Sequence, residues 1–177
     1  MTSNAQLEKE INTTLSKIPN ILLEKAEKKG WSCRITNLRN LENEYGYDFK
    51  ISGLTDYIRS QIVVYATFDG VHYALPHEMG HLLDQLLGNI TDSDEWDDIY
   101  KKAKTNIKNK WQPEWHTKYN ILQEKYFLDI ENKKEFFADA FLLYCMDRPL
   151  LKETTSLCEI FDRAIEALEY MDECYIV

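Results

Sequence analysis

Apolar residues recur at helical spacing along most of the chain, and this pattern predicts a mainly helical fold. Residues 4–29 carry the first apolar stripe, which Pro19 divides into two helices because proline suits a first turn but not a helix interior. A further helix begins in the acidic stretch 92–98. Residues 133–146 and 156–172 predict two more helices, and the first of these is apolar on nearly every side, which is typical of a buried helix.

Strand signals are confined to short stretches that alternate apolar and polar residues or are rich in β-branched residues. These stretches are 31–36 and 62–67, and the second is the stronger signal. Asp69 and Gly70 follow it as a typical hairpin turn, so residues 71–74 are predicted to form a returning strand. Such a hairpin either only completes a small sheet or pairs an extended peptide substrate along residues 62–67.

A His-Glu-x-x-His motif comes next, on a predicted helix of residues 75–87 that Gly88 ends. Positions four apart face the same side of a helix, so His77 and His81 can offer two imidazoles to one metal ion. Glu78 can reach a metal-bound water as general base. Two solvated or core-packed histidines are the alternative, but a chance motif is rare in a chain with four histidines. The motif therefore predicts a zinc site.

Two other residues of this helix bear on the site. Asp84 extends the polar stripe of His77 and His81 by one more turn. Gly80 is unfavourable in a helix interior, by up to about 1 kcal/mol relative to alanine. Close packing against another element near the metal would explain a glycine at this position.

The predicted helix at 133–146 carries two carboxylates, Glu135 and Asp139, on one face of an otherwise apolar surface. A buried carboxylate is costly unless a charge or several donors lie beside it, and zinc with a histidine ligand supplies both. We expect His77, His81 and Glu135 to be the protein ligands of Zn²⁺, with water in the position that catalytic zinc sites keep open. Asp139 would accept a hydrogen bond from the outer ring nitrogen of His77. A partly exposed helix start with ordinary salt bridges is the alternative.

Length and composition are those of a globular chain: 177 residues, 44% hydrophobic and 29% charged. They predict one domain over residues 1–177, built as two lobes, a helix and sheet lobe at 1–74 and a helical lobe at 75–177. The net charge of −9 disfavours nucleic acid as a partner and is compatible with a cationic peptide or protein. No apolar run reaches the length of a membrane span, so we expect no membrane partner.

The cysteines lie far apart, and none has a neighbour at metal-binding spacing: Cys33, Cys145, Cys158 and Cys174. We expect free thiols in a reducing compartment rather than disulfides. The first residues show neither the basic region nor the apolar core of a signal peptide, which favours a cytoplasmic location.

Two segments together resemble a known family. Residues 77–84 have the pattern HExxHxxD, and residues 135–141 read Glu-Phe-Phe-Ala-Asp-Ala-Phe. In this order they resemble the catalytic domain of anthrax lethal factor and its smaller relatives, the Pro-Pro endopeptidases, over about residues 60–147. The resemblance implies an α+β, mainly helical, zincin-like metallopeptidase domain with a small sheet beside the metal helix. It also implies that both histidines and Glu135 bind zinc and that Glu78 is the catalytic base.

The same resemblance implies an oxyanion-stabilising tyrosine shortly before the third ligand. Its usual place is seven residues upstream of that ligand, where this chain has Leu128. Tyr126, nine residues upstream of Glu135, is the nearest candidate, and Tyr119 is further away. The relatives are generally secreted, which stands against the cytoplasmic location that the first residues favour.

These observations predict a zinc-dependent endopeptidase that acts on a peptide or protein. Zn²⁺ would lower the pKa of its water toward about 7, Glu78 would take the proton, and zinc with a tyrosine would stabilise the oxyanion. Two alternatives remain: a catalytically inactive zinc-containing binding module of the same fold, and a helical interaction protein without metal. Cleavage specificity stays open because residues 37–60 and 117–132, where pocket loops are expected, carry no clear pattern.

Overall fold

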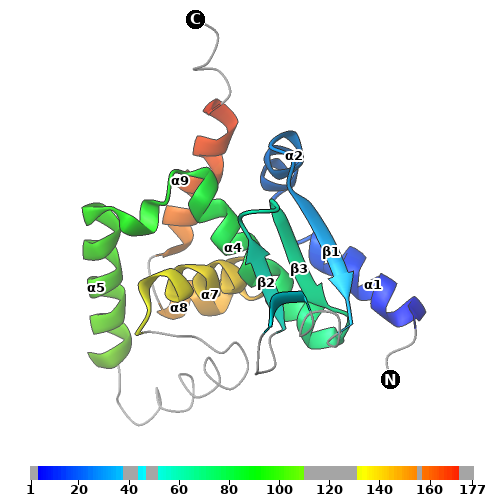
Figure 1. Cartoon of the computed structure of the whole chain (residues 1–177). Helices are drawn as coiled ribbons and strands as arrows, with labels where there is room; N and C mark the ends of the chain where they lie inside the picture. The colour runs from blue at the N-terminus through cyan, green and yellow to red at the C-terminus, as the bar shows by residue number, and fades with distance from the viewer. Residues whose placement is uncertain (1–3, 38–43, 47–51, 110–130, 155–156, 172–177) are drawn as a thin grey trace, which may run out of the picture.

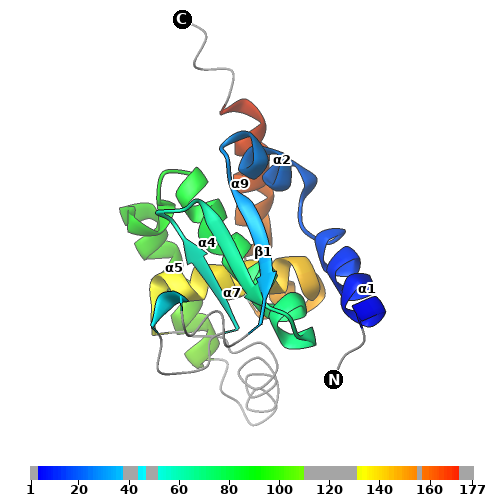
Figure 2. The same ribbon diagram turned by 45° about the vertical axis from the view of Figure 1, so that its right-hand side comes forward.

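The computed structural model describes residues 4–37, 44–46, 52–109, 131–154 and 157–171. Within these residues the fold is α+β and mainly helical, with a small three-stranded sheet, as the sequence predicts. The sheet lies on one side of the molecule and most helices lie behind and beside it (Figures 1 and 2). The division into lobes at 1–74 and 75–177 stays a prediction.

The helices follow the apolar stripes of the sequence closely. Pro19 precedes α2 as its N-cap, so the predicted break between the first two helices is confirmed, and Gly30, at φ +78°, follows the end of α2. None of the described helices is both long and apolar enough to cross a membrane. Among the described residues, the α-helices outside the His-Glu-x-x-His motif are α1 (Asn4–Leu15), α2 (Asn20–Lys28), α5 (Asp94–Asn109), α7 (Lys133–Met146), α8 (Arg148–Thr154) and α9 (Leu157–Tyr170).

The sheet has the order β1-β3-β2, with β1 at Ser32–Thr36, β2 at Gly53–Asp56 and β3 at Gln61–Tyr65. β3 runs parallel to β1 and antiparallel to β2, so it is the central strand. The predicted strand at 62–67 is therefore confirmed, but a substrate lying along it is wrong, because both edges of β3 are already paired. Among the described residues, no strand pairs with the outer edge of β2.

The predicted returning strand at 71–74 is wrong. Residues Gly70–Ala74 form a π-helical turn, η1, that leads directly into α4 (Leu75–Leu86). A Cβ at Gly70 would lie 2.1 Å from the backbone oxygen of Tyr65, so this position holds glycine because the chain folds back tightly onto the end of β3. The close approach turns the chain away from the sheet, and β2, which precedes β3, takes the antiparallel place instead.

α4 lies between the sheet and α7 and forms the centre of the hydrophobic core (Figures 1 and 2). Gly80 of α4 faces α7: a Cβ there would lie 2.8 Å from the Cα of Ala138 and 3.1 Å from the Cβ of Phe141. Only glycine therefore allows the two helix backbones to approach this closely, which explains its presence in a helix interior. The contact sets α7 against α4 at the level of the predicted metal ligands.

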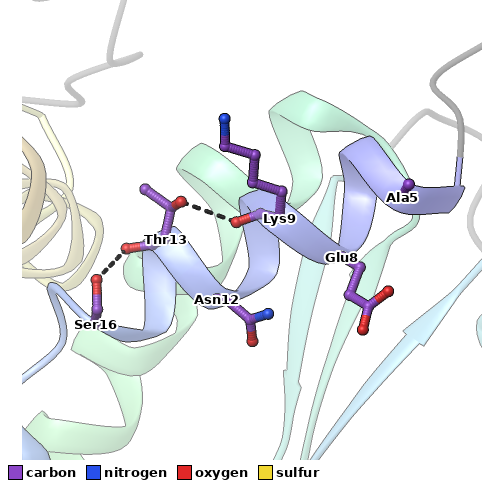
Figure 3. A pocket seen from close by; sticks show the side chains of 6 residues that line it. All are labelled: Ala5, Glu8, Lys9, Asn12, Thr13 and Ser16. Atoms are coloured by element: carbon purple, nitrogen blue, oxygen red, sulfur yellow. Dashed lines mark hydrogen bonds between the residues drawn. The ribbon is translucent and has the colours of Figure 1, made fainter.

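A shallow hollow follows the outer face of α1, away from this core (Figure 3). Two of its polar side chains are occupied within the helix: the Thr13 hydroxyl donates to the Lys9 carbonyl and the Ser16 hydroxyl donates to the Thr13 carbonyl, both at 2.8 Å. A hollow lined by one helix alone has no facing wall, so it offers a ligand little enclosure. Its lining residues are Ala5, Glu8, Lys9, Asn12, Thr13 and Ser16.

Candidate metal centre

α4 presents His77 and His81 on one face, one turn apart, as its helical spacing requires. Pro76 lies in the first turn of this helix and Gly88, at φ +82°, follows its end, so the predicted helix bounds are confirmed. The two Nε2 atoms lie 3.2 Å apart, with the ring planes at 82°. Both imidazoles thus aim the same nitrogen at a common point.

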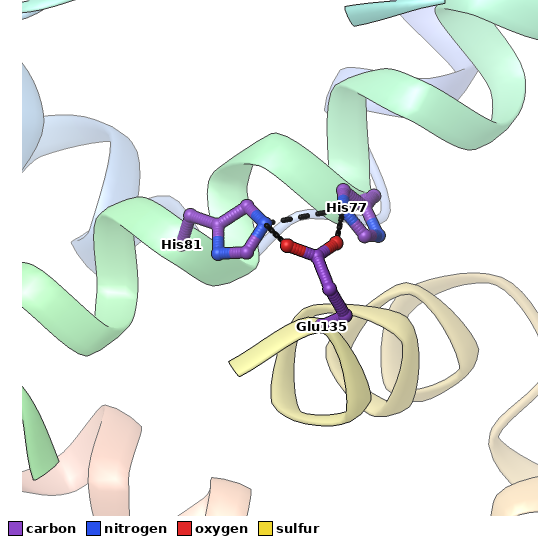
Figure 4. Close-up of side chains that lie close together, drawn as sticks. All are labelled: His77, His81 and Glu135. Atoms are coloured by element: carbon purple, nitrogen blue, oxygen red, sulfur yellow. Dashed lines mark hydrogen bonds and ion pairs between the residues drawn. The ribbon is translucent and has the colours of Figure 1, made fainter. Parts of the chain in front are cut away.

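Glu135 reaches that point from α7 (Figure 4). Its carboxylate lies between the two rings, 3.3 Å from Nε2 of His77 and 3.6 Å from Nε2 of His81. Its position follows from the start of α7, where the Asn132 side chain accepts hydrogen bonds from the backbone N–H groups of Lys134 and Glu135. The cap fixes the first helical turn, which carries the carboxylate toward α4.

The three donor groups fit one tetrahedral zinc ion. Two ligands at about 2.0–2.1 Å from such an ion stand roughly 3.3 Å apart. The two imidazole nitrogens are 3.2 Å apart, and the Glu135 carboxylate approaches His77 with Oε2 at 3.3 Å and His81 with Oε1 at 3.6 Å, which is close to this spacing. Two imidazole nitrogens and one carboxylate oxygen are also a donor set that catalytic zinc sites use. His77, His81 and Glu135 therefore form a candidate metal-binding triad.

Asp139, one turn after Glu135 on α7, is 4% exposed and contacts the other nitrogen of a triad histidine. Its Oδ1 lies 2.7 Å from Nδ1 of His77. With Nδ1–H donating to this carboxylate, the Nε2 lone pair of His77 is left facing the triad. The structure thus brings together the residues that the sequence predicted for the ligand set and its supporting partner.

The electrostatics of the triad favour a positive charge. Burial alone would lower the pKa of His77, but hydrogen bonds with Asp139 and Glu135 and the charge of Glu78 raise it to about 10. Hydrogen bonds from His77 and His81 hold the pKa of Glu135 well below its usual range. The carboxylates therefore favour a protonated, positively charged His77 in the absence of metal. A divalent cation between these side chains would supply the positive charge instead.

Glu78 is 7% exposed and points toward the sheet. The Thr55 hydroxyl of β2 donates to its Oε2 over 2.6 Å, and Gly53 of the same strand lies against the stem of its side chain. The sequence pattern missed both residues because β2 falls in the stretch 37–60 that shows no clear periodicity. Their signal was the spacing of two, which places Gly53 and Thr55 on one face of a strand.

Asp84 lies outside the triad although it continues the polar stripe of α4. Its carboxylate is buried and accepts hydrogen bonds from the backbone N–H of Thr91 at 2.9 Å and from the Thr91 hydroxyl at 2.7 Å. Thr91 belongs to η2 (Ile90–Asp92), a short 3₁₀ turn after α4. Asp84 therefore fixes the chain that leaves α4. The polar stripe of this helix thus contains two residues of the candidate triad and one residue with a structural contact.

The predicted oxyanion residue Tyr126 lies outside the described residues, as does Tyr119. A different tyrosine, Tyr57, stands at the end of β2 and was not singled out by the sequence pattern. Tyr57 is half-buried, and this partial burial raises its pKa to about 12, with the charges of Glu78, Asp84 and Glu135 adding to the effect. Its ring packs edge-on against Trp31 at 6.0 Å. Tyr57 is thus a neutral phenol within the electrostatic reach of the triad.

Part of the chain matches a known protein family. The family described as anthrax toxin lethal factor, N- and C-terminal domain, matches residues 59–157, a span that contains α4, α7 and the whole triad. No curated protein matches the chain, and no solved structure matches it.

Proposed function

Because this chain belongs to the anthrax toxin lethal factor family, N- and C-terminal domain, we propose that it is a zinc-dependent endopeptidase. The description of this family names both the N-terminal and the C-terminal domain of the toxin, so the match does not by itself assign a metal. The observation that supports the catalytic assignment is the candidate triad itself: two histidines and a glutamate at zinc-ligand spacing. Glu78 follows His77 directly in the chain, and its charge acts on that histidine.

In this proposal His77, His81 and Glu135 hold the ion, and Asp139 keeps His77 in the tautomer that can bind it. A bound zinc ion supplies Lewis acidity, which lowers the pKa of water at the site and polarises a peptide carbonyl. The Glu78 carboxylate takes the proton of the attacking water and passes it to the leaving amine. A neutral tyrosine hydroxyl donates to the developing oxyanion.

The substrate of this proposal is an extended peptide paired with the outer edge of β2. This edge has no strand partner among the described residues, and its Gly53 and Thr55 contact Glu78. A peptide added to β2 would pass beside the triad, with backbone hydrogen bonds fixing its register. The net charge of −9 suits a cationic peptide over an acidic one.

A peptide-library digest with product sequencing tests the proposal. Wild-type protein with one equivalent of Zn²⁺ is expected to cleave a subset of peptides, and Glu78→Ala is expected to lose cleavage while retaining zinc. Glu166→Ala, which removes an exposed carboxylate on α9, is the matched control and is expected to cleave like wild type. Zinc binding without any cleavage would instead favour an inactive binding module, and absence of stoichiometric zinc would favour a protein without metal.

A further inference from the structure

We propose that Thr55 is a positioning residue for the general base, and that β2 holds the Glu78 carboxylate in its working orientation. This inference rests on the proposed endopeptidase function. It assigns a part in that reaction to a strand that supplies no metal ligand.

The contact between the two side chains is short and buried. The Oγ1 of Thr55 lies 2.6 Å from Oε2 of Glu78 and 3.3 Å from the Glu78 carbonyl oxygen. A hydroxyl has one proton to donate, and the carboxylate at the shorter distance is the stronger acceptor. Thr55 is 8% exposed and Glu78 7%, so water competes little for this bond.

The bond gives the two carboxylate oxygens of Glu78 different roles. A glutamate side chain has several rotatable bonds, and a base that turns freely spends much of its time out of reach of its proton. With Oε2 held by Thr55, Oε1 remains to accept a proton. The strand thereby supplies orientation, while the helix supplies the position of the Glu78 Cα.

Gly53 completes the support from the same face of β2. A Cβ at this position would lie 3.0 Å from Cγ and from Oε1 of Glu78, and equally close to the Cβ of Ala74. The strand backbone therefore packs directly against the glutamate stem, and a larger residue would displace it. Restraint of the carboxylate comes from two residues rather than from one hydrogen bond.

β2 is a firm support because the central strand holds it. Thr55 pairs with Ile62 and Gly53 pairs with Val64, and these β3 residues are 2% and 0% exposed. Elements anchored in the core hold functional groups more accurately than loops do. The orientation of Glu78 is thus tied to the hydrophobic core through two strands.

The test compares Thr55→Val, which removes the hydroxyl at similar volume, with Thr55→Ser, which keeps it. Kinetics are measured on a peptide taken from the library digest, with zinc content determined for each variant. We expect Thr55→Val to lower kcat by roughly tenfold to hundredfold with little change in KM or zinc content, and Thr55→Ser to recover most of the rate. Wild-type kcat in Thr55→Val, or no recovery in Thr55→Ser, would overturn the inference.

Thr91→Val is the matched control, because it removes another buried threonine-to-carboxylate bond made to α4, the one to Asp84. It is expected to lower the melting temperature without lowering kcat. If both valine variants lower kcat equally, the effect of Thr55 is general destabilisation and the positioning role is wrong.

A readout without activity completes the design. Melting temperatures of Thr55→Val, Glu78→Ala and the double variant form a cycle in metal-free protein, and the two losses are expected to be non-additive because the residues share one bond. Fully additive losses would contradict the contact. An inactive wild type with a non-additive cycle would refute the endopeptidase function but not the contact, whereas an active wild type with unchanged Thr55→Val kinetics would refute the positioning role alone.

Discussion

The two sides of the candidate site are built differently. On one side, α4 and α7 present the triad from two buried helices whose backbones meet at Gly80 and Ala138. On the other side, β2 ends in a turn where Tyr57 is 50% exposed and Ile58 is 97% exposed. Buried helix packing suits metal ligands, which need fixed spacing, while an exposed turn suits contacts that vary with the substrate. Metal affinity and cleavage specificity should therefore respond to mutations on different sides.

Removing Glu135, the proposed ligand on α7, is expected to have the largest effect on this comparison. Glu135→Ala leaves two histidines one turn apart and should weaken zinc binding by at least about a hundredfold, because a catalytic site needs three protein ligands. Glu131→Ala, which removes an exposed carboxylate just before α7, is the control and should bind zinc normally. Zinc titration by competition with a chelator measures both. Unchanged zinc affinity in Glu135→Ala would show that α7 supplies no ligand to the metal.

The tyrosines test the substrate side. If one hydroxyl stabilises the oxyanion, its replacement by phenylalanine should lower kcat by about a hundredfold and leave zinc binding unchanged. Tyr126→Phe and Tyr57→Phe are to be compared in the same assay. A loss in Tyr126→Phe alone agrees with the family resemblance, and a loss in Tyr57→Phe alone assigns the role to the end of β2. Normal rates in both variants would exclude both residues.

Gly80→Ala tests whether the stability of the protein and the geometry of the candidate triad depend on the close contact between α4 and α7. The added Cβ would lie 2.8 Å from the Cα of Ala138, so the helices must separate or strain. We expect a loss of about 1–3 kcal/mol in the free energy of unfolding, together with weaker zinc binding. Ile58→Ser, at the exposed turn, should leave stability unchanged and alter only KM. Denaturant unfolding measures the free energy of unfolding of both variants. A Gly80→Ala protein as stable as wild type would show that the helix contact is dispensable.

The smallest expected effect is a pH dependence of the metal-free protein. The pKa of His77 is raised from 6.5 to about 10, so its contribution to stability is complete below about pH 6.5 and declines as pH rises toward 10. The pKa of Glu135 is lowered from 4.5, so its contribution is complete above about pH 4.5 and declines in acid. Between roughly pH 7 and 9 the free energy of unfolding should fall by about 1 kcal/mol per pH unit. Urea titrations across this range measure the slope.

Saturating zinc provides the control for that slope, because metal binding requires neutral His77 and removes its proton. The slope between about pH 7 and 9 should then flatten. A metal-free protein with the same flat profile would show that His77 carries no extra proton and that the carboxylates do not act on it as described.

The grouping of the candidate triad could be predicted from the sequence because its signals are local or nearly so. The spacing of His77 and His81 is a property of one helix, and the apolar surroundings of Glu135 and Asp139 mark them as carboxylates that need a partner. Even Gly80 carried a signal, as a residue that only close packing would explain. Each of these inferences needs helical periodicity and little knowledge of the rest of the fold.

The part of the site formed by β2 and the turn after β3 could not be predicted in the same way. Asp69 and Gly70 look like a hairpin turn, but the close contact of Gly70 with Tyr65 decides the conformation, and that contact depends on tertiary packing. β2 is short and begins with glycine, so alternation is hardly visible in it. The contact of Thr55 with Glu78 joins residues 23 positions apart and has no local signature.

The packing of α7 on α4 also sets the order of events during synthesis. His81 and Glu135 are 54 positions apart in the chain (135 minus 81), and closing a flexible segment of that length costs roughly 3.5 kcal/mol in entropy. A growing chain that has released only α4 offers two imidazoles and no carboxylate from α7. If the triad binds zinc as proposed, complete coordination must wait until α7 has emerged from the ribosome and docked, so the metal would be loaded late in folding rather than at its start.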